Sequence, residues 1–573
     1  MLIFDFAGTD NMVRRQVFNN PADVLATNVL EEVPVILEKV QEAVNKGYYA
    51  AGYVSYEAAP AFDQALVSVP SEMPLVWFGL YEQAEETAPI EDREYQVSEW
   101  VPSIGQERYA EAITAIKGRI ENGDTYQVNY TLRLEASFSG DSLAFYQDLA
   151  KAQSASYSAY LQMDDYTVIS ASPELFFRIN KNQIMTRPMK GTVKRGMTWE
   201  DDREKAEWLA ASEKNQAENV MIVDLLRNDL SKIARKGTVK VPSLFEIEKY
   251  PTVYQMTSTV TAELEESTGL LQVFQALFPC GSITGAPKVK TMEIISELEG
   301  SPREVYCGAI GYISPYGEAV FNVPIRTVLL NHLTGKAKYG VGGGITWDSE
   351  AGDEYEETVA KAAILKKKPI QFELLETIRL EDGHLYLLDN HMNRLQKTAD
   401  YFGFPIDEEA VRQSLAETVK SYKEGLYKVR LLLSKDGQLT FDIARIELME
   451  GKLIVDIAKE AVSSDNPFLY HKTTHRSVYE KHRCMNPSVE DVLLWNERGE
   501  LTEFTNGNIV AEINGRLYTP PISCGLLGGT FREQLLADHL IEEKVLYLKD
   551  LERCSRVWII NSVRKWAEVD FVH

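Results

Sequence analysis

The chain has 573 residues, 45% hydrophobic and 25% charged, which is the composition of an ordinary globular protein. Its formal net charge of −25 argues against a broad contact with nucleic acid or an anionic membrane surface. No apolar run reaches the roughly 18 residues of a membrane span, and no signal peptide or CxxC pair is visible, so we expect a protein of the reducing cytoplasm.

The first hundred residues predict short strands and one helix. The strand-like runs are YYAAGYVSYE at 48–57 and MPLVWFGLYE at 73–82, and the helix is expected over 21–47. An amphipathic helix follows at 107–124, and helices and strands then alternate up to about residue 365.

The run AAILKKKPIQFELLETIRL marks a change of character. A helix is expected to end at its three lysines and proline, and a strand-rich part follows. We therefore place the main boundary near Lys368–Pro369. The predicted parts are an N-terminal subdomain at 1–100, a catalytic part at 101–367 and a second part at 370–573. In the second part, SKDG at 434–437 separates two β-like runs and predicts a hairpin turn.

One predicted helix carries an acid on its apolar face. Glu218 precedes Met221, Ile222 and Leu225 by three, four and seven residues, so it shares their face. An ionised carboxylate on such a face is costly unless it is paired or bound to a cation. A buried salt bridge with an arginine and a bound metal ion are the alternatives that this helix leaves open.

A second acidic cluster follows a triple-glycine loop, Gly342–Gly344. Glu354, Glu357 and Lys361 are spaced three and four residues apart on an expected helix and share one face. Glycines let the backbone approach a ligand closely, but this loop has neither the Walker nor the Rossmann pattern. A solvated, salt-bridged helix face is one interpretation. The other is that these acids and Glu218 bind Mg²⁺, a hard ion that prefers oxygen ligands.

The run TRPMKGTVKRG, at 186–196, places Lys190 among cations in an otherwise acidic chain. Arg187, Lys194 and Arg195 are expected to disfavour its charged form and so to lower the pKa of its ammonium group. An ordinary surface lysine at a strand-end turn is the alternative, and this segment alone favours it.

Six motifs in a fixed order provide a family resemblance. They are ASPELFFRI, RPMKGTVKRG, AENVMIVDLLRNDL, FPCGSITGAPKVKTMEII, FNVPIRTV and YGVGGGITWDSEAGDEYEETVAKA. The chain resembles the chorismate-utilising enzymes from roughly residue 100 to 365, which implies an α+β sandwich around a large antiparallel sheet. The residues that resemble the family's Mg²⁺ ligands are Glu218, Glu354 and Glu357. Those that resemble its contacts with the substrate's carboxylates and hydroxyl are Thr192, Arg326, Gly342, Gly343, Gly344 and Lys361.

Two positions discriminate among the members of this family. Gln127 stands where the water-using isochorismate-type enzymes have a lysine base, so the incoming group is expected to be already nucleophilic, as ammonia is. Lys190 stands where anthranilate synthases usually have alanine and aminodeoxychorismate synthases have a lysine that attacks the chorismate ring. This resemblance makes Lys190 the covalent nucleophile, which requires a free amine, and Glu174 the general acid for the departing hydroxyl. One departure is Gln255, where many relatives have histidine.

The second part carries a separate constellation around Lys472. Glu503 lies on an apolar, hydroxyl-rich strand of an expected hairpin, and Gly528–Thr530 lead into an expected helix, a favourable setting for phosphate. Arg394 lies on the face of another helix. A lysine, a buried acid and a phosphate cradle together fit pyridoxal phosphate. Taken singly, a surface lysine, turn glycines and a helix arginine are the alternatives.

These residues resemble the class IV aminotransferase-like family, fold type IV, over roughly residues 370–573. The resemblance rests on ETIRL, HMNRL, HKTTHR, EFTNGN and SCGLLGGTFR. It implies that Lys472 is the Schiff-base lysine and proton shuttle and that Glu503 is the partner of the pyridinium nitrogen. The remaining cofactor contacts that it implies are Asn508 and, at the phosphate, Arg394, Gly529 and Thr530. The glycine-rich lead-in usual before the first strand is replaced here by PIQFELLETIRL.

The two resemblances together imply a two-step enzyme. The first part is expected to convert chorismate and ammonia to 4-amino-4-deoxychorismate, and the second to eliminate pyruvate and release 4-aminobenzoate for folate synthesis. No glutamine amidotransferase motif is present, so a separate amidotransferase subunit is implied. The alternatives are an anthranilate-type synthase fused to a class IV amino-acid transaminase, and a non-catalytic metabolite-sensing protein. The oligomeric state is open, with a homodimer through the second part as one alternative.

Overall fold

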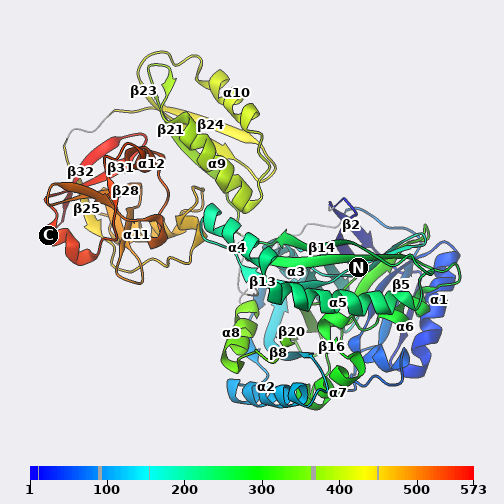
Figure 1. Cartoon of the computed structure of the whole chain (residues 1–573). Helices are drawn as coiled ribbons and strands as arrows, with labels where there is room; N and C mark the ends of the chain where they lie inside the picture. Colours follow the sequence, from blue (N-terminus) through cyan, green and yellow to red (C-terminus); the bar gives the residue numbers. More distant parts are fainter. Residues whose placement is uncertain are drawn as a thin grey trace. The chain divides into compact units, whose positions relative to one another are not determined.

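Two compact units divide the chain (Figure 1). The first unit contains Met1–Lys194 and Ala206–Pro369, and the second contains Arg195–Lys205 and Ile370–His573. This computed structural model describes residues 1–10, 12–87, 93–153, 155–362, 365, 370–447 and 451–572. The predicted boundary at Lys368–Pro369 lies outside the described residues. In the described ranges, no helix is long and apolar enough to cross a membrane.

Two large antiparallel sheets form the frame of the first unit. In the described residues, the first sheet has ten strands, with the path β16-β8-β20-β19-β10-β9-β1-β2. These strands are β16 (Gly285–Ala286), β8 (Gln127–Gly140), β20 (Lys336–Ile345), β19 (Thr327–Asn331), β10 (Tyr166–Ser172), β9 (Tyr157–Gln162), β1 (Leu2–Ala7) and β2 (Val13–Phe18). Two short strands, β6 (Tyr95–Val97) and β7 (Val101–Pro102), also pair with β8.

The second sheet also has ten described strands, with the path β13-β15-β12-β11-β18-β17-β4-β5-β3. These strands are β13 (Met189–Lys194), β15 (Val253–Glu263), β12 (Gln183–Arg187), β11 (Leu175–Asn180), β18 (Glu318–Asn322), β17 (Ala309–Ile313), β4 (Tyr49–Val54), β5 (Val76–Tyr81) and β3 (Asp23–Thr27). β14 (Lys240–Lys249) pairs with β15 on its other side. The strands predicted at 48–57 and 73–82 are therefore confirmed as β4 and β5.

The two sheets pack face to face through one buried cluster. Phe4 and Val168 of the first sheet and Tyr53 and Ile310 of the second belong to it. Successive side chains of a strand point to opposite faces, so each strand contributes every second residue to this layer. The first unit is thus a sandwich of two sheets with helices on its outer faces.

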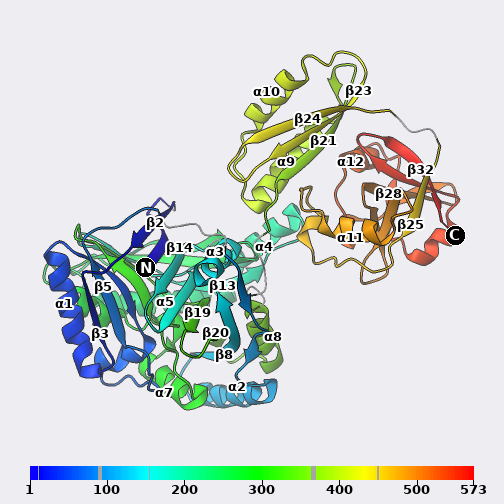
Figure 2. The same cartoon turned by 180° about the vertical axis from the view of Figure 1, so that it is seen from behind.

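The helix predicted over residues 21–47 is shorter than expected. Asp23–Thr27 form β3, an edge strand paired with β5, and α1 (Val33–Asn45) begins only at Val33. Pro34 lies in its first turn, where the fixed proline φ suits a helix and no N–H is needed. Figure 2 shows α1 beside β3 and β5. Pairing with β5 therefore outweighs the local helix preference of the first residues.

Three helices lie next to the strands that carry the candidate residues. α5 (Glu213–Ser231) packs on β13 and β15, and α8 (Ala351–Ala362) packs on β20 and on α2 (Gln106–Glu121), the helix predicted at 107–124. The triple glycine was predicted to be a loop, but Gly342–Gly344 lie inside strand β20, opposite Asn129–Thr131 of β8. The prediction was wrong because glycine runs that lack side chains show no alternation by which a strand is recognised.

Further helices of the first unit cover the sheets. They are α3 (Ser142–Gln153), α6 (Leu270–Leu277) and α7 (Lys288–Glu299), while α4 (Trp199–Ala211) begins in the segment Arg195–Lys205 of the second unit.

The second unit starts with a four-stranded antiparallel sheet of order β22-β21-β23-β24. Its strands are β22 (His384–Leu385), β21 (Leu374–Glu381), β23 (Leu426–Leu433) and β24 (Leu439–Arg445). α9 (Leu388–Phe402) packs on β21, and α10 (Glu408–Val419) packs on β24. The predicted hairpin turn at 434–437 joins β23 to β24 and is confirmed.

A mixed sheet of eight described strands follows, with the path β27-β26-β25-β32-β31-β28-β29-β30. Its strands are β27 (Leu501–Phe504), β26 (Asp491–Trp495), β25 (Leu453–Ile457), β32 (Lys565–Phe571), β31 (Arg556–Asn561), β28 (Gly507–Ile513), β29 (Arg516–Thr519) and β30 (Glu542–Glu543). β27 also pairs with β28, which closes the first part of the sheet into a barrel. Two helices, α11 (Ser477–Met485) and α12 (Thr530–Ala537), belong to this part.

Candidate functional site

Lys190 is the centre of the candidate site in the first unit. It lies on β13, which packs against α5. Burial lowers the pKa of the Lys190 ammonium, Glu218 opposes this, and Lys361 adds to it. Glu174 and Glu354 also act on its charge and favour the protonated form. The structure therefore brings these predicted acids and Lys361 within electrostatic reach of one lysine.

The cations that flank Lys190 in the sequence are not the cause of its lowered pKa. Arg187 Nη2 lies 3.0 Å from a Glu246 oxygen and 2.8 Å from a Glu248 oxygen, and Arg195 pairs with Asp202 in the second unit. The predicted direction of the shift is confirmed, but its predicted origin is wrong. Burial and Lys361, distant in sequence, lower this pKa instead.

Gly344 and Gln127 lie directly against the Lys190 side chain. A Cβ atom on Gly344 would lie 2.7 Å from Lys190 Nζ and would overlap Gln127 Nε2, so only glycine lets β20 approach both groups. The Gln127 amide is buried, and neither its oxygen nor its nitrogen has a hydrogen-bond partner among the described residues. Buried amides are nearly always bonded. An orphaned amide beside a half-buried lysine therefore points to a polar ligand at this place.

Glu174 forms the acidic side of this site. Ser282 Oγ donates a hydrogen bond to Glu174 Oε1 at 2.6 Å, and Ser282 Oγ lies 3.1 Å from Cys280 Sγ. Burial raises the pKa of Glu174 to about 7, although the Ser282 hydrogen bond and the charge of Lys190 act in the opposite direction. A carboxyl group with this pKa can hold or release a proton at neutral pH. Ser282 was missed from the sequence, because only the fold brings its loop to Glu174.

Gln255 holds the two residues that follow Lys190. Thr192 Oγ1 donates to Gln255 Oε1 at 2.9 Å, and Gln255 Nε2 donates to the Gly191 carbonyl at 2.9 Å. Gly191 has a φ of 93°, and a Cβ atom there would lie 3.0 Å from Asn215 Cβ. The glutamine that replaces the histidine of many relatives thus anchors β13 to β15, and it occupies the Thr192 hydroxyl that was predicted to contact substrate.

The three predicted metal ligands do not converge. Glu354 accepts a hydrogen bond from Ser349 Oγ at 2.7 Å, and Glu357 pairs with Lys361 at 2.8 Å. Lys361 Nζ also donates to the Gly342 carbonyl at 3.0 Å. In the part of the chain that the structure describes, no three His, Cys, Asp or Glu side chains are close enough to hold one metal ion. The carboxylates fit Mg²⁺ in kind, but Lys361 is the partner of Glu357 in this arrangement.

Arg326 lies near Tyr250, which lines a cavity of about 230 Å³. Its Nη1 donates to Gln153 Oε1 at 2.6 Å, and its guanidinium lies 6.0 Å from the ring centre of Tyr250. Tyr250 lines the cavity together with Pro173 and Met189, the sequence neighbours of Glu174 and Lys190. Burial lowers the pKa of Arg326, because removal from water disfavours its charged form.

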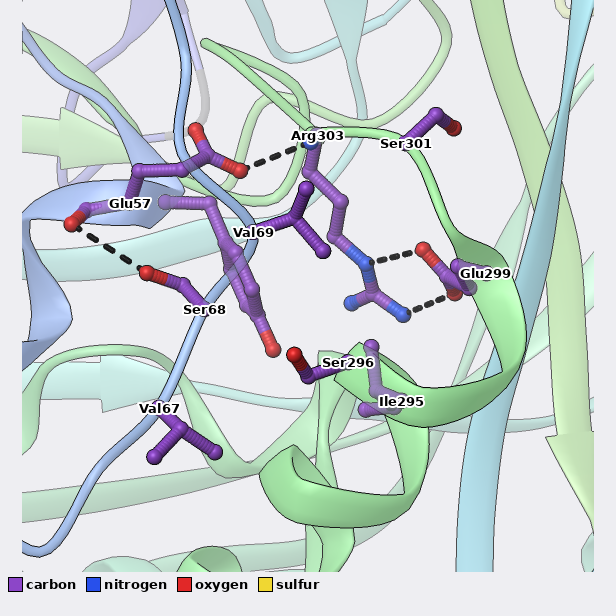
Figure 3. Close-up of a pocket in the computed structure, with 10 residues that line it drawn as sticks. Glu57, Val67, Ser68, Val69, Ile295, Ser296, Glu299, Ser301 and Arg303 are labelled. Carbon is purple, nitrogen blue, oxygen red and sulfur yellow. Dashed lines mark hydrogen bonds and ion pairs between the residues drawn. The ribbon is translucent and has the colours of Figure 1, made fainter.

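A smaller pocket in the same unit is lined by charged residues that compensate one another (Figure 3). Arg303 pairs with Glu299 at 2.6 Å, and the Glu57 carboxylate accepts the Arg303 backbone N–H at 2.7 Å. Burial raises the pKa of Glu57 to about 8. Because each charged group already has a partner, this pocket has no need of a charged ligand, and we assign it a structural role.

Lys472 is the centre of the site in the second unit. The Leu375 N–H donates to the Lys472 carbonyl at 3.0 Å, which ties the lysine segment to β21. Burial lowers the pKa of Lys472 to about 8, Arg394 and Arg476 add to this, and Glu376 opposes it. A substantial neutral fraction of the amine is therefore present near pH 8.

Glu503 lies on β27, in the predicted hairpin, and its charge acts on Lys472. Its carboxylate accepts hydrogen bonds from Tyr479 Oη at 2.8 Å and from the Leu527 N–H and Asn508 Nδ2 at 3.2 Å each. Burial raises the pKa of Glu503 to about 7. Asn508 also donates to the Leu527 carbonyl at 2.8 Å, so its amide orients Glu503 and the following loop.

The loop before α12 lies close to Asn508 in this site. A Cβ atom on Gly529 would overlap Asn508 Oδ1, and α12 begins at Thr530 with its first backbone N–H groups free of helical partners. Arg394 Nη1 donates to the Gly528 carbonyl at 3.1 Å. The fold thus brings together a lysine, a carboxyl group, and a helix start that has glycines before it and an arginine beside it. This set fits pyridoxal phosphate.

Family models match both units. Residues 6–367 match the model for chorismate binding enzymes. The chain belongs to the chorismate-binding enzyme family. Residues 373–571 match the amino-transferase class IV model. The predicted two-part α+β fold and both family resemblances are confirmed.

Curated relatives named aminodeoxychorismate synthase component 1 match part of the chain. The one from Klebsiella aerogenes is 42% identical over 276 residues, 48% of this chain and 61% of that relative. The one from Escherichia coli (strain K12) is 41% identical over 286 residues, 50% of this chain and 62% of that relative. The chain thus spans about six tenths of the length of these relatives.

The solved structure of anthranilate synthase component I from Streptococcus pneumoniae TIGR4 is also similar. It has a TM-score of 0.53 and 26% sequence identity, and the match covers 64% of this chain and 90% of that one. The similarity supports the sandwich fold of the first unit.

Replacing Gln255 should loosen the strand that carries Lys190. In Gln255→Ala, Thr192 and the Gly191 carbonyl lose a partner each, so the backbone amides of residues 191–194 should exchange hydrogen several-fold faster in mass spectrometry, since each bond contributes about 1 kcal/mol. Gln272→Ala, at the exposed start of α6, should leave this peptide unchanged. Equal protection in Gln255→Ala and the unmodified protein would contradict the anchoring role.

Proposed function

We propose that the first unit converts chorismate and ammonia to 4-amino-4-deoxychorismate and that the second eliminates pyruvate from it, giving 4-aminobenzoate. The observation that carries the first step is a half-buried lysine with a lowered pKa, Lys190, in a site with Glu174 and the orphaned Gln127 amide. The names of the curated relatives support the same reaction.

Lys190 would act as the nucleophile of the first step. Its neutral amine attacks the chorismate ring and forms a carbon–nitrogen bond, while Glu174 gives its proton to the ring hydroxyl, which leaves as water. Ammonia then adds to the ring, and the bond to Lys190 breaks, which restores the amine. A lysine whose pKa is lowered and a carboxyl group with a pKa of about 7 suit these two roles.

Gln127 would select ammonia over water. An amide cannot remove a proton from water, so it leaves water a poor nucleophile, whereas ammonia needs no activation. The word component in the relatives' names supports a separate partner that supplies the ammonia. We assign that role to a glutamine amidotransferase.

The remaining predicted residues would bind substrate and ion. Arg326 and Lys361 are the cations available for chorismate carboxylates, with the backbone of Gly342–Gly344 beside them. Mg²⁺ would be held by Glu218, Glu354 and Glu357, and would neutralise substrate carboxylates. In the described residues these acids do not converge on one point.

In the second unit, Lys472 would move the proton. Pyridoxal phosphate, when bound, supplies an electron sink for charge that develops on the substrate. Nζ of Lys472, with a pKa of about 8, takes the proton from the carbon that bears the substrate's amino group. Glu503, which Tyr479 and Asn508 orient, would hold the pyridinium nitrogen. The same groups serve transaminases, and the linkage to a synthase unit supports elimination.

Lys190→Ala should lower 4-amino-4-deoxychorismate formation at least 100-fold or shift the product toward anthranilate, because the ring loses its covalent partner. Products from chorismate, ammonium and Mg²⁺ are identified by mass spectrometry. Lys194→Ala, at an exposed position of the same strand, is the matched control and should keep the normal rate. An unchanged rate and product in Lys190→Ala would exclude the nucleophile role.

Ser282→Ala should move the pH profile of the first step. The lost hydrogen bond stabilises the ionised form of Glu174, so its removal should raise the pKa from about 7 by about one unit. The acid role needs the protonated form, so the alkaline fall in activity should shift to higher pH. Ser282→Thr, which keeps the hydroxyl, should restore the original profile. A drop in rate without a shift would contradict the assignment of Glu174.

Lys472→Ala should consume chorismate at close to the normal rate but accumulate 4-amino-4-deoxychorismate, because the first unit has its own lysine and carboxyl groups. Product analysis should show no 4-aminobenzoate or pyruvate until a separate lyase is added. Lys481→Ala, an exposed lysine paired with Glu460, should behave as the unmodified protein. Rapid transfer of amino groups between 2-oxo acids by the unmodified protein would replace the lyase assignment with a transaminase.

A further inference from the structure

A buried carboxylate on β21, Glu376, links the two sides of the proposed phosphate site. Its Oε1 accepts a hydrogen bond from Arg394 Nε at 2.9 Å, and its Oε2 accepts one from Arg394 Nη2 at 2.6 Å. His391 Nδ1 lies 2.6 Å from the same Oε2, and His391 Nε2 lies 3.3 Å from Thr530 Oγ1. The Glu376 and His391 side chains are 1% and 0% exposed.

We propose that Glu376 and His391 are positioning residues that hold Arg394 and Thr530 in place for the phosphate of the cofactor. The inference rests on the cofactor site proposed for the second unit. It adds two residues that act on the phosphate through others and need not touch it.

The geometry of Arg394 leaves donors for an anion in a fixed direction. A guanidinium has five N–H donors. Nε and one N–H of Nη2 bind Glu376, and one N–H of Nη1 binds the Gly528 carbonyl. One N–H on each terminal nitrogen remains. The bidentate pair with Glu376 fixes the plane of the guanidinium, so these two donors are preorganised.

His391 extends the same control to the start of α12. The short Nδ1 contact with Glu376 needs a proton on Nδ1, so in the neutral ring Nε2 is an acceptor. Burial lowers the pKa of His391, which favours this neutral form. The Thr530 hydroxyl then donates to Nε2, which leaves the Thr530 backbone N–H at the helix start for the anion.

Electrostatics keep the linking carboxylate ionised. Burial alone would raise the pKa of Glu376, but Arg394 and His391 outweigh burial and lower it to about 2. Glu376 therefore remains an anion at working pH, and it balances the charge of Arg394 before phosphate binds. Arg394 in turn lowers the pKa of Lys472, so the guanidinium acts on the cofactor lysine as well as on the loop at Gly528.

A comparison of two ligands tests the role of Glu376. The affinity of apoprotein for pyridoxal phosphate and for pyridoxal, which lacks phosphate, is measured by absorbance titration. In Glu376→Gln, affinity for pyridoxal phosphate should fall about tenfold or more, because Arg394 loses its ionic partner. Affinity for pyridoxal should stay within about twofold. Glu381→Gln, on the same strand with a 46% exposed side chain paired with Arg379, is the matched control and should change neither.

His391→Asn tests the second residue and keeps the Glu376–Arg394 pair, so it remains informative if Glu376→Gln fails to fold. This variant should lower the affinity for pyridoxal phosphate by a smaller factor, about threefold, and should leave the affinity for pyridoxal unchanged. Equal losses for both ligands, or no loss in either variant, would overturn the proposal. If the unmodified protein does not prefer pyridoxal phosphate over pyridoxal, the cofactor site itself is wrong. Normal selectivity without pyruvate release would refute only the lyase reaction.

Discussion

Removing an ionisable group from water raises the free energy of its charged form, and both candidate sites are organised around groups in this condition. Burial lowers the pKa of Lys190 and of Lys472, and it raises the pKa of Glu174 and of Glu503 to about 7. Nucleophilic amines and proton-carrying acids both need such values near neutrality. The folds of the two units differ, but each places a half-buried lysine near a buried carboxyl group.

In both units, the site depends on a glycine that lets the backbone lie close to neighbouring side chains. In the first unit, β20 reaches Lys190 and Gln127 only because Gly344 has no side chain, and in the second unit Gly529 allows Asn508 to approach the loop before α12. A methyl group at either place would push apart the residues that define the site. The paired strands β8 and β20, and the barrel closed by β27 and β28, are therefore what keeps these approaches constant.

Local sequence was a sound guide to elements and to motif residues, and a poor guide to neighbours. The helix that carries Glu218, the strand that carries Glu503 and the helix start at Thr530 follow from periodicity and flanking residues, and the structure has all three. The predicted origin of the lowered Lys190 pKa was wrong because Arg187, at the end of β12, and Arg195, beyond the end of β13, pair with acids that are distant or separate from Lys190. Contacts such as Ser282 with Glu174 join residues 108 positions apart, and no local pattern encodes them.

Two buried carboxyl groups of the second unit have opposite pKa shifts, because their neighbours differ. Glu376 and Glu503 are both inside the protein, yet the pKa of Glu376 is lowered to about 2 and that of Glu503 is raised to about 7. Glu376 forms an ion pair with the guanidinium of Arg394, whereas the hydrogen bonds that Glu503 accepts from Tyr479, Asn508 and Leu527 come from neutral donors. The first is a permanent anion, suited to orienting a cation. Glu503 changes charge near neutrality, which suits a group that exchanges a proton. In the first unit, Glu174 and Glu299 differ in the same way, because Arg303 lowers the pKa of Glu299 whereas the pKa of Glu174 is raised to about 7.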